Sequence, residues 1–406
     1  MNCIDLFSGA GGLTEGFTQA GYNMLAHVEK EYPACLTLKT RLAYHHLKKI
    51  GNLDIYRKYI KGDISRDELY SHIPKTILDT VINREINDNT INEIFSQLDS
   101  LIENKSIDII IGGPPCQAYS LIGRACSRDK VESDERNYLY KQYLKFLDRY
   151  KPNIFVFENV RGLLSAHNRK LLPQIILEME ELGYTVEKQL LDAKDFGVPQ
   201  TRKRLIIIGW KKNINFSYPS FEKIENNITI NELFKDLPPL KPGESILYKN
   251  FKTKNKSLIE TNIFDSEWNI LTQHISRPHN ERDLEIYKIA IEEMNRGNIL
   301  KYDSDLIPQR LKTHKNLKSF LDRFKVVNGN SVSHTMVAHI SKDGHHYIHP
   351  DVNQIRSITL REAARIQTFP DSYYFENSRT AAFTQIGNAV PPLMAKIIAE
   401  KIKEAF

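Results

Sequence analysis

The fold of this chain is decided by a stretch near its start, Cys3-Ile4-Asp5-Leu6-Phe7-Ser8-Gly9-Ala10-Gly11-Gly12. A short apolar run of this kind predicts a buried strand. The glycines after it allow backbone N–H groups to approach a ligand closely at the start of a helix. The stretch therefore predicts a strand, a ligand-binding loop and a helix in direct succession.

Four further apolar runs follow before residue 211, at 24–28, 107–111, 154–157 and 205–208. Helical patterns separate them. Continuous apolar strands alternating with helices predict a mostly parallel sheet that is covered on both faces. The expected fold class is therefore α/β, a doubly wound domain in which ligands bind beyond the carboxyl ends of the strands.

The composition of the sequence changes at about Lys211, where Asn, Lys and Ser become frequent and prolines interrupt the alternation of strand and helix patterns. We expect residues 211–355 to form a second, smaller domain. Regular patterns resume near the end, with helices predicted at about 359–367 and 392–404. The first domain would then comprise 1–210 and 356–406.

Composition restricts the class of protein further. The chain has 406 residues, of which 41% are hydrophobic and 26% charged, as is typical of a soluble globular protein. It contains no apolar run of about 18 residues and opens without a signal peptide, so a cytoplasmic protein is expected. The four cysteines form no Cys-x-x-Cys pair, which predicts neither a zinc site nor disulfides. The net charge of +6 permits a polyanionic partner but does not indicate one.

Two polar features follow the first two strands. The glycine loop suits a nucleoside ligand, although a dinucleotide would fit equally well and a turn that serves only packing is an alternative. Glu29 ends the second strand, a position from which a carboxylate can accept hydrogen bonds from both ribose hydroxyls. A solvated surface carboxylate is the alternative for Glu29.

A cysteine loop follows the run at 107–111, with the sequence Gly112-Gly113-Pro114-Pro115-Cys116. The two prolines fix the backbone directly before the thiol, and the two glycines relieve crowding ahead of them. Most single cysteines are buried and inert. A thiol held on a rigid loop at the ligand-binding edge of a sheet is instead expected to be a nucleophile.

The ordered set of motifs resembles the bacterial DNA cytosine-5 methyltransferases of restriction-modification systems. The resemblance covers about 1–210 and 356–406. The motifs that carry it are Asp5-Leu6-Phe7-Ser8-Gly9-Ala10-Gly11-Gly12, Gly113-Pro114-Pro115-Cys116-Gln117, Glu158-Asn159-Val160, Gln200-Thr201-Arg202-Lys203-Arg204, Arg361-Glu362-Ala363-Ala364-Arg365-Ile366-Gln367-Thr368-Phe369-Pro370 and Gln385-Ile386-Gly387-Asn388-Ala389-Val390-Pro391.

This resemblance implies a catalytic set. Cys116 would add to carbon 6 of cytosine, which makes carbon 5 a nucleophile for the methyl group. Glu158 would hold its proton near neutral pH and donate it at ring nitrogen 3, and Arg204 would stabilise charge on the carbonyl oxygen. Arg202 is expected to support the same loop. A helix cap is the alternative for Glu158, and a phosphate contact or salt bridge for either arginine.

The resemblance also implies S-adenosylmethionine as methyl donor, with no metal. The implied cofactor residues are Phe7, Gly9, Gly11, Glu29, Pro115, Leu139, Asn388 and Val390. Because Asn388 lies near the chain end, that end should fold back beside the first strand. The acidic residue that reads adenine is less clear: Asp63 lies too far upstream, while Asn83 and Glu85 follow the apolar run Val81-Ile82, and Glu85 is favoured.

Duplex DNA is the expected partner, and the target base must leave the helix to be reached. Gln117 and Ser120 are placed to contact DNA near that base, with loop-stabilising hydrogen bonds as the alternative. Sequence reading would fall to the second domain, where the basic runs 252–256 and 310–315 could meet phosphates or be solvated faces. We expect a monomer whose cognate restriction endonuclease is not necessarily bound.

Histidines gather at 333–350, but their spacing matches no common zinc pattern. The alternation there and the Asp343-Gly344 turn predict a β-hairpin instead.

Among rival functions, a zinc deaminase would need the pattern Pro-Cys-x-x-Cys, and position 119 does not supply its second cysteine. An RNA cytosine methyltransferase and a catalytically silent DNA-binding protein stay open, and the set of Cys116, Glu158 and Arg204 argues against the latter.

Overall fold

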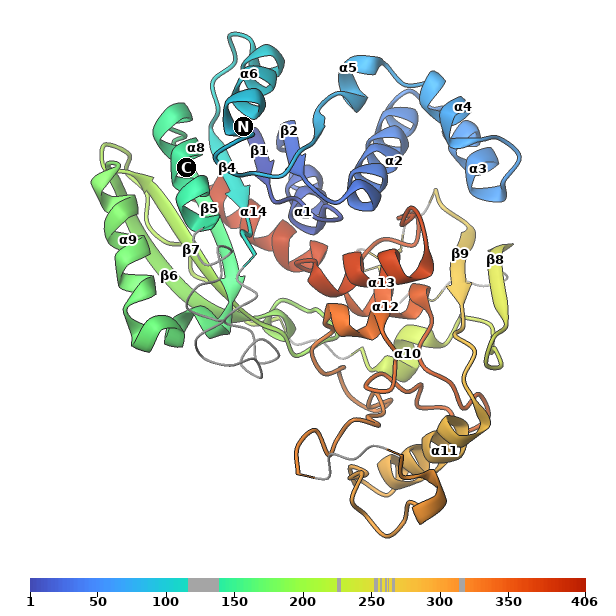
Figure 1. The fold of residues 1–406 in the computed structure, drawn as a ribbon. Helices are drawn as coiled ribbons and strands as arrows, with labels where there is room; N and C mark the ends of the chain where they lie inside the picture. Colours follow the sequence, from blue (N-terminus) through green and yellow to red (C-terminus); the bar gives the residue numbers. More distant parts are fainter. Residues whose placement is uncertain are drawn as a thin grey trace.

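The computed structural model describes residues 1–115, 139–224, 228–251, 255, 258–259, 261, 263–264, 267–313 and 318–406. A seven-stranded sheet lies at its centre, with the strand order β3-β2-β1-β4-β5-β7-β6 (Figure 1). All strands run parallel except β7, which is antiparallel to both of its neighbours. The strands are β1 (Asn2–Leu6), β2 (Asn23–Glu29), β3 (Val81–Asn83), β4 (Ile109–Gly112), β5 (Ile154–Val160), β6 (Tyr184–Asp192) and β7 (Lys203–Lys211).

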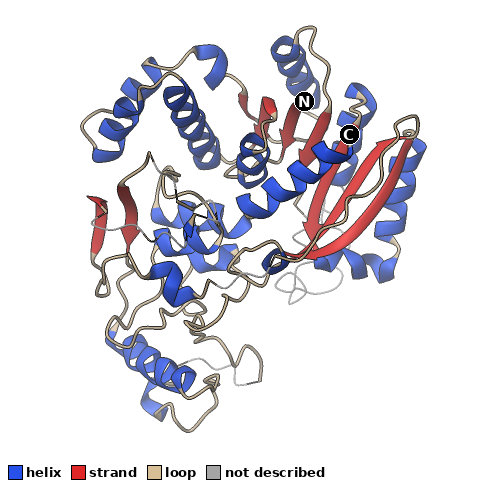
Figure 2. Cartoon of the chain, turned by 180° about the vertical axis from the view of Figure 1, so that it is seen from behind, coloured by secondary structure: helices blue, strands red, loops and turns tan. Residues whose placement is uncertain are grey.

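Helices cover both faces of this sheet (Figure 2). One face packs against α6 (Ile91–Ile102), α8 (Leu139–Tyr150) and α9 (Leu171–Glu181). The other packs against α1 (Gly12–Gln19) and α14 (Pro392–Ala405). The strands are buried on both sides because their sequences are continuously apolar. The predicted doubly wound α/β fold is confirmed.

The strand order reverses direction between β1 and β4. From β1 the chain proceeds outward to β2 and β3, and it then returns to place β4 on the other side of β1. Ligands of doubly wound sheets bind at such a switch point, outside the carboxyl ends of the strands. The two loops that begin there are the glycine loop after β1 and the cysteine loop after β4.

The remainder of the chain builds a second region below the sheet in Figure 1. Its elements are α10 (Ile230–Phe234), β8 (Ser245–Asn250), β9 (Ile270–Ile275) and α11 (Glu281–Asn295), and the helices α12 (Leu360–Ile366) and α13 (Arg379–Asn388) pack against it. One hydrophobic core joins side chains from 230–271 to side chains from 358–389. The helices α12 and α13 therefore connect the second region to the returning chain end.

Extra helices follow α2 (Tyr32–Lys49), namely α3 (Leu53–Lys61), α4 (Arg66–Ser71) and α5 (Lys75–Leu78). They account for the long spacing between the second strand and the cysteine loop. Tyr44 packs edge-on and Tyr56 at a tilt against Trp268, which precedes β9. This cluster braces the insertion against the second region.

Most elements expected from the sequence are present, including the helices near 359–367 and 392–404. The hairpin predicted at 333–350 is wrong. Residues Ala338–Ser341 form a short 3-10 helix, and the flanking residues bridge to other segments, Ser333 to Gln200 and Ile348 to Val326. The alternation arose from side chains buried between those segments. In the described part of the chain, no helix has the length and apolar character needed to cross a membrane.

Candidate active site

The glycine loop packs tightly against the end of the chain. A Cβ atom at Gly12 would lie 2.1 Å from the carbonyl oxygen of Val390, and one at Gly16 would lie 2.4 Å from the Cβ of Ala395. The Tyr373 hydroxyl also donates to the carbonyl of Ala10. Glycine at 12 and 16 thus permits α14 to lie directly on α1. The expectation that the chain end folds back beside the first strand is confirmed.

With respect to the described residues the same loop is open at Gly9, where a Cβ atom would meet none of their heavy atoms within 4 Å. Phe7 and Gly11 both adopt positive φ, 56° and 79°. Such backbone is unfavourable for phenylalanine and recurs where a loop is held for function. The loop therefore offers free space at Gly9 beside a backbone that the surrounding packing holds in an unusual shape.

Glu29 lies at the rim of this space. Its carboxylate accepts hydrogen bonds from the backbone N–H of Gly9, at 2.7 Å, and of Glu31, at 2.8 Å. Burial raises the pKa of Glu29, and the two N–H donors oppose that shift. A buried carboxylate beside open space fits a ligand that carries hydroxyl donors, such as a ribose.

The three residues considered for adenine differ in position. Asp63 follows the left-handed C-cap of α3, in the inserted helices. Asn83 turns its amide to the backbone carbonyls of Glu29 and Lys30. Glu85 is exposed beyond β3 and pairs with Lys30 at 3.2 Å. Of the three, only Glu85 has an exposed carboxylate that directly follows β3, the strand beside the one that ends at Glu29.

The base of the cysteine loop is fixed by the end of β5. A Cβ atom at Gly113 would lie 2.7 Å from Oε2 of Glu158, so glycine permits the close approach of that carboxylate. The Asn159 amide donates to the carbonyl of Pro114 at 3.2 Å. Cys116, Gln117 and Ser120 lie outside the described residues.

Glu158 and Arg204 form an ion pair, with 2.8 Å between Oε1 and Nε. Val160 and Arg204 are register partners in the antiparallel pairing of β5 and β7, which places the two side chains at one edge. Both are largely but not fully buried, with side chains 12% and 13% exposed. Burial lowers the pKa of Arg204, and Glu158 opposes the shift. The salt bridge considered for Arg204 is present, and its partner is Glu158.

Arg202 does not contact this pair. Its guanidinium is buried and donates to the backbone carbonyls of Met336, Gly387 and Ala389. Through these bonds it ties the start of β7 to both sides of Asn388. These contacts agree with the expectation that Arg202 supports the loop.

The remaining residues predicted to bind the cofactor differ in burial. Asn388 ends α13 with an exposed side chain, and Val390 is buried against the glycine loop. Pro115 and Leu139 are half-buried on either side of 116–138.

Gln200 begins the motif that contains Arg202 and Arg204, but its sequence position alone indicated no role for it. Its amide donates to Gln367, whose own amide donates to the carbonyl of Ile386.

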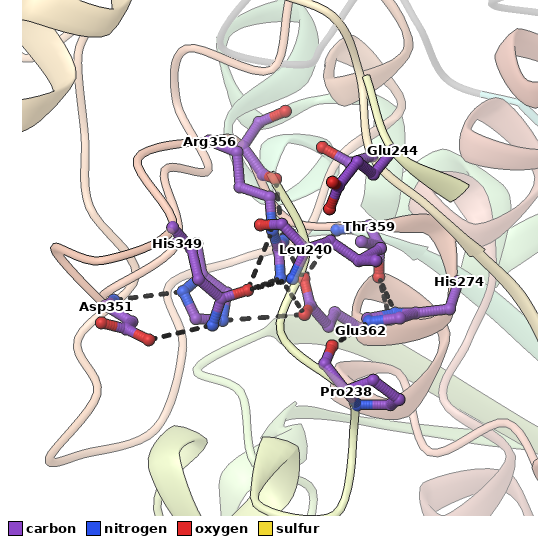
Figure 3. Close-up of polar contacts among 12 residues, drawn as sticks. Pro238, Leu240, Glu244, His274, His349, Asp351, Arg356, Thr359 and Glu362 are labelled. Carbon is purple, nitrogen blue, oxygen red and sulfur yellow. Dashed lines mark hydrogen bonds and ion pairs between the residues drawn. The ribbon is translucent and has the colours of Figure 1, made fainter. Parts of the chain in front are cut away.

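A buried ionic joint connects the second region to α12 (Figure 3). Glu362 accepts from both guanidinium ends of Arg356, at 2.8 and 2.7 Å, and from the backbone N–H of Thr359. His274 lies between Thr359 and the carbonyl of Pro238. Arg356 is fully buried and Glu362 nearly so. The joint has the contacts of a structural connection.

Three possible metal ligands, His279, Asp283 and His345, gather beside α11, with their ligand atoms within 4.8 Å of one another. The Tyr287 hydroxyl already bonds to Nδ1 of His345 at 2.7 Å and to Nδ1 of His279 at 3.4 Å. Arg282 also donates to Asp283. These contacts describe a hydrogen-bonded network, and His279 and Asp283 lie outside the histidine-rich stretch of the sequence.

The basic run 310–315 is partly occupied by contacts within the chain. Arg310 pairs with Glu285 and Lys312 bonds to the carbonyl of Asp303. Of the run 252–256, only residue 255 is described. Where they are described, the two runs predicted to meet phosphates therefore offer few free cations.

Comparison with known proteins identifies the class. Residues 1–68 and 68–404 match the C-5 cytosine-specific DNA methylase family. The chain belongs to this family, and it is a DNA (cytosine-5)-methyltransferase.

Individual relatives agree. The chain is 46% identical to type II methyltransferase M.Bpa9945I of Bacillus paralicheniformis, over 100% of this chain and 99% of the relative. It is 31% identical to type II methyltransferase M.DdeI of Desulfomicrobium norvegicum, over 100% and 89%. A crystal structure described as a prophage-encoded DNA modification methyltransferase from E. coli covers 100% of this chain with a TM-score of 0.67 at 22% identity, which supports the fold.

Proposed function

We propose that this enzyme methylates carbon 5 of a cytosine that is flipped out of a specific duplex DNA sequence, through a covalent adduct with Cys116. The observation that carries the proposal is the Glu158–Arg204 ion pair at the base of the cysteine loop. The pair places a carboxyl group and a cation at one partly accessible edge of the sheet, the two kinds of group that attack on a neutral ring requires.

The open side of the glycine loop and the buried Glu29 carboxylate fit S-adenosylmethionine. Phe7, Gly9, Gly11, Pro115, Leu139, Asn388 and Val390 would surround the methionine and ribose, and Glu29 would accept from the ribose hydroxyls. Glu85 would read the adenine. When bound, S-adenosylmethionine supplies an electrophilic methyl group. Arg202 would hold the backbone on both sides of Asn388 in place.

The chain's own residues would act as follows. The Cys116 thiolate forms a bond to carbon 6 of cytosine, and Glu158 donates a proton to ring nitrogen 3 as electrons move there. Arg204 stabilises the carbonyl oxygen. Carbon 5 is then nucleophilic and takes the methyl group. Loss of the carbon 5 proton to a base, elimination of the thiolate and return of the ring nitrogen 3 proton to Glu158 restore both the aromatic ring and the enzyme.

The organisation of the chain supports separate regions for catalysis and for reading the DNA sequence. Residues 1–210 and 356–406 would form the catalytic domain, and 211–355 would read the DNA sequence, with Gln117 and Ser120 near the flipped base. The type II relatives support a role as the modification enzyme of a restriction-modification system. We propose a cytoplasmic monomer that acts independently of its cognate endonuclease.

The test is to incubate the enzyme with labelled S-adenosylmethionine and a mixture of duplex DNA sequences, with duplex RNA as a parallel sample. We expect label in DNA only, and bisulfite sequencing should place it on cytosine within one sequence. Label confined to RNA, or no labelled cytosine in any DNA sequence, would overturn the proposal.

A further inference from the structure

The segment that follows the catalytic Glu158 is basic and strained. Residues 161–170 have the sequence Arg-Gly-Leu-Leu-Ser-Ala-His-Asn-Arg-Lys, with no acidic residue. His167, Asn168 and Arg169 adopt φ of 45°, 53° and 70° in succession. Left-handed backbone is unfavourable for residues other than glycine, and strain of this kind clusters at functional sites. The turn reverses the chain before α9 and leaves Arg169 and Lys170 exposed.

Two buried side chains anchor this segment to the hydrophobic core. Leu163 and Ala166 are buried in the core between the sheet and α9, so the outward direction of the charged residues is fixed by packing. Arg161 directly follows Val160, the register partner of Arg204 in β7. The residue before Arg204 is Lys203, which is also exposed. Arg161 and Lys203 therefore adjoin the Glu158–Arg204 pair, and Arg169 and Lys170 end the same segment before α9.

These cations also lack acidic partners. In the described part of the chain, Arg161, Arg169, Lys170 and Lys203 make no ion pair. Other surface arginines do, since Arg149 pairs with Asp99 and Arg310 with Glu285. Four unpaired cations beside a site that must hold a flipped nucleotide form a surface suited to a polyanion.

We propose that this basic turn, consisting of Arg161, Arg169, Lys170 and Lys203, binds backbone phosphates of duplex DNA beside the target cytosine. The inference rests on the proposed function and adds where the DNA backbone lies. Contacts of this kind fix the position of the duplex without reading its sequence. The basic turn would thereby hold the strand while the second region reads the bases.

The test measures DNA affinity against salt concentration for the full-length enzyme. Each phosphate contact contributes about 0.9 to the slope of log K against log salt, so Arg169→Ala with Lys170→Ala should lower the slope by up to about 1.8. The loss should be equal for duplexes with and without the methylated sequence. The charge-preserving pair Arg169→Lys with Lys170→Arg should keep the wild-type slope.

The matched control is Lys58→Ala with Lys61→Ala, which removes two exposed cations from α3, far along the sheet from the basic turn. This control should behave as wild type. A wild-type slope in the alanine variant of the basic turn, an equal loss in the control, or a loss seen with duplex RNA and not with DNA would overturn the inference. A wild-type enzyme that methylates no DNA would instead overturn the proposed function.

Discussion

Two carboxylate–arginine pairs in this enzyme differ in surroundings. Glu158 has Arg204 as its ion-pair partner, and both side chains keep about an eighth of their surface exposed. Glu362 binds Arg356 through both oxygens, caps α12 at Thr359 and is almost completely buried. The first pair has room to exchange its partner for a substrate. The second is fully engaged within the protein, so the proposed account gives the same two residue types a role in chemistry in one region and in assembly in the other.

The largest effect on activity should come from a substitution in the Glu158–Arg204 pair. Glu158→Gln keeps the shape of the side chain but removes the acid, so the turnover rate should fall by about 10²–10⁴-fold. The unfolding free energy should fall by less than the roughly 3–5 kcal/mol expected for a fully buried pair, because both side chains keep some contact with solvent. Rates of methyl transfer and chemical denaturation test the two statements. Near-normal activity in this variant would remove Glu158 from the catalytic set.

The buried pair should show the reverse. Glu362→Gln leaves the Arg356 charge buried without compensation, and the unfolding free energy should fall by about 3–5 kcal/mol. Activity at low temperature, where the variant remains folded, should be close to normal. Denaturant titration supplies the measurement. A stable but inactive variant would contradict the structural role of this pair.

Substitution of Arg202 should affect neither catalysis alone nor stability alone, because Arg202 is buried like Glu362 yet holds the backbone around Asn388. Arg202→Met should raise the dissociation constant for S-adenosylmethionine more than it lowers the rate at saturating cofactor. Arg204→Lys is the matched comparison and should mainly lower the rate. A loss of rate in Arg202→Met with unchanged cofactor affinity would argue against the positioning role.

The smallest effect concerns pH. His27 is fully buried in β2, its two ring nitrogens have no hydrogen-bond partner among the described residues, and burial lowers its pKa to about 4. The unfolded chain, with a histidine pKa of about 6.5, binds this proton first, so stability should fall as the pH drops from about 6.5 to 4. His27→Leu should reduce that slope by up to about 1.4 kcal/mol per pH unit. Denaturation at two pH values checks this, and an unchanged slope would contradict it.

Much of the catalytic region was predictable from the sequence, because its strands are continuous apolar runs and its loops carry glycine or proline. Strand β6 was missed since it alternates little and is mostly exposed along its middle. Helix α11 was missed although Asn280 caps it at Asp283, because its apolar face is narrow. The role of Arg202 depends on carbonyls more than a hundred residues away, which no local pattern reveals.

The second region was the least predictable part. Its packing depends on irregular segments that bridge distant residues, as Ser333 does with Gln200, and these carry no periodicity. The false hairpin followed from reading such a bridge as a local turn. The ionic joint at Glu362 was hidden inside a recognised motif, where a capping box from Thr359 was the one local signal.

The central claim, that Cys116 attacks cytosine beside the Glu158–Arg204 pair, is tested most directly by trapping the enzyme on duplex DNA that carries 5-fluorocytosine. Fluorine at carbon 5 blocks the final elimination, so the adduct should persist on a denaturing gel, and peptide mass spectrometry should place it on Cys116. The Cys116→Ser variant should give no adduct. A persistent adduct in that variant, or attachment at another residue, would contradict the account.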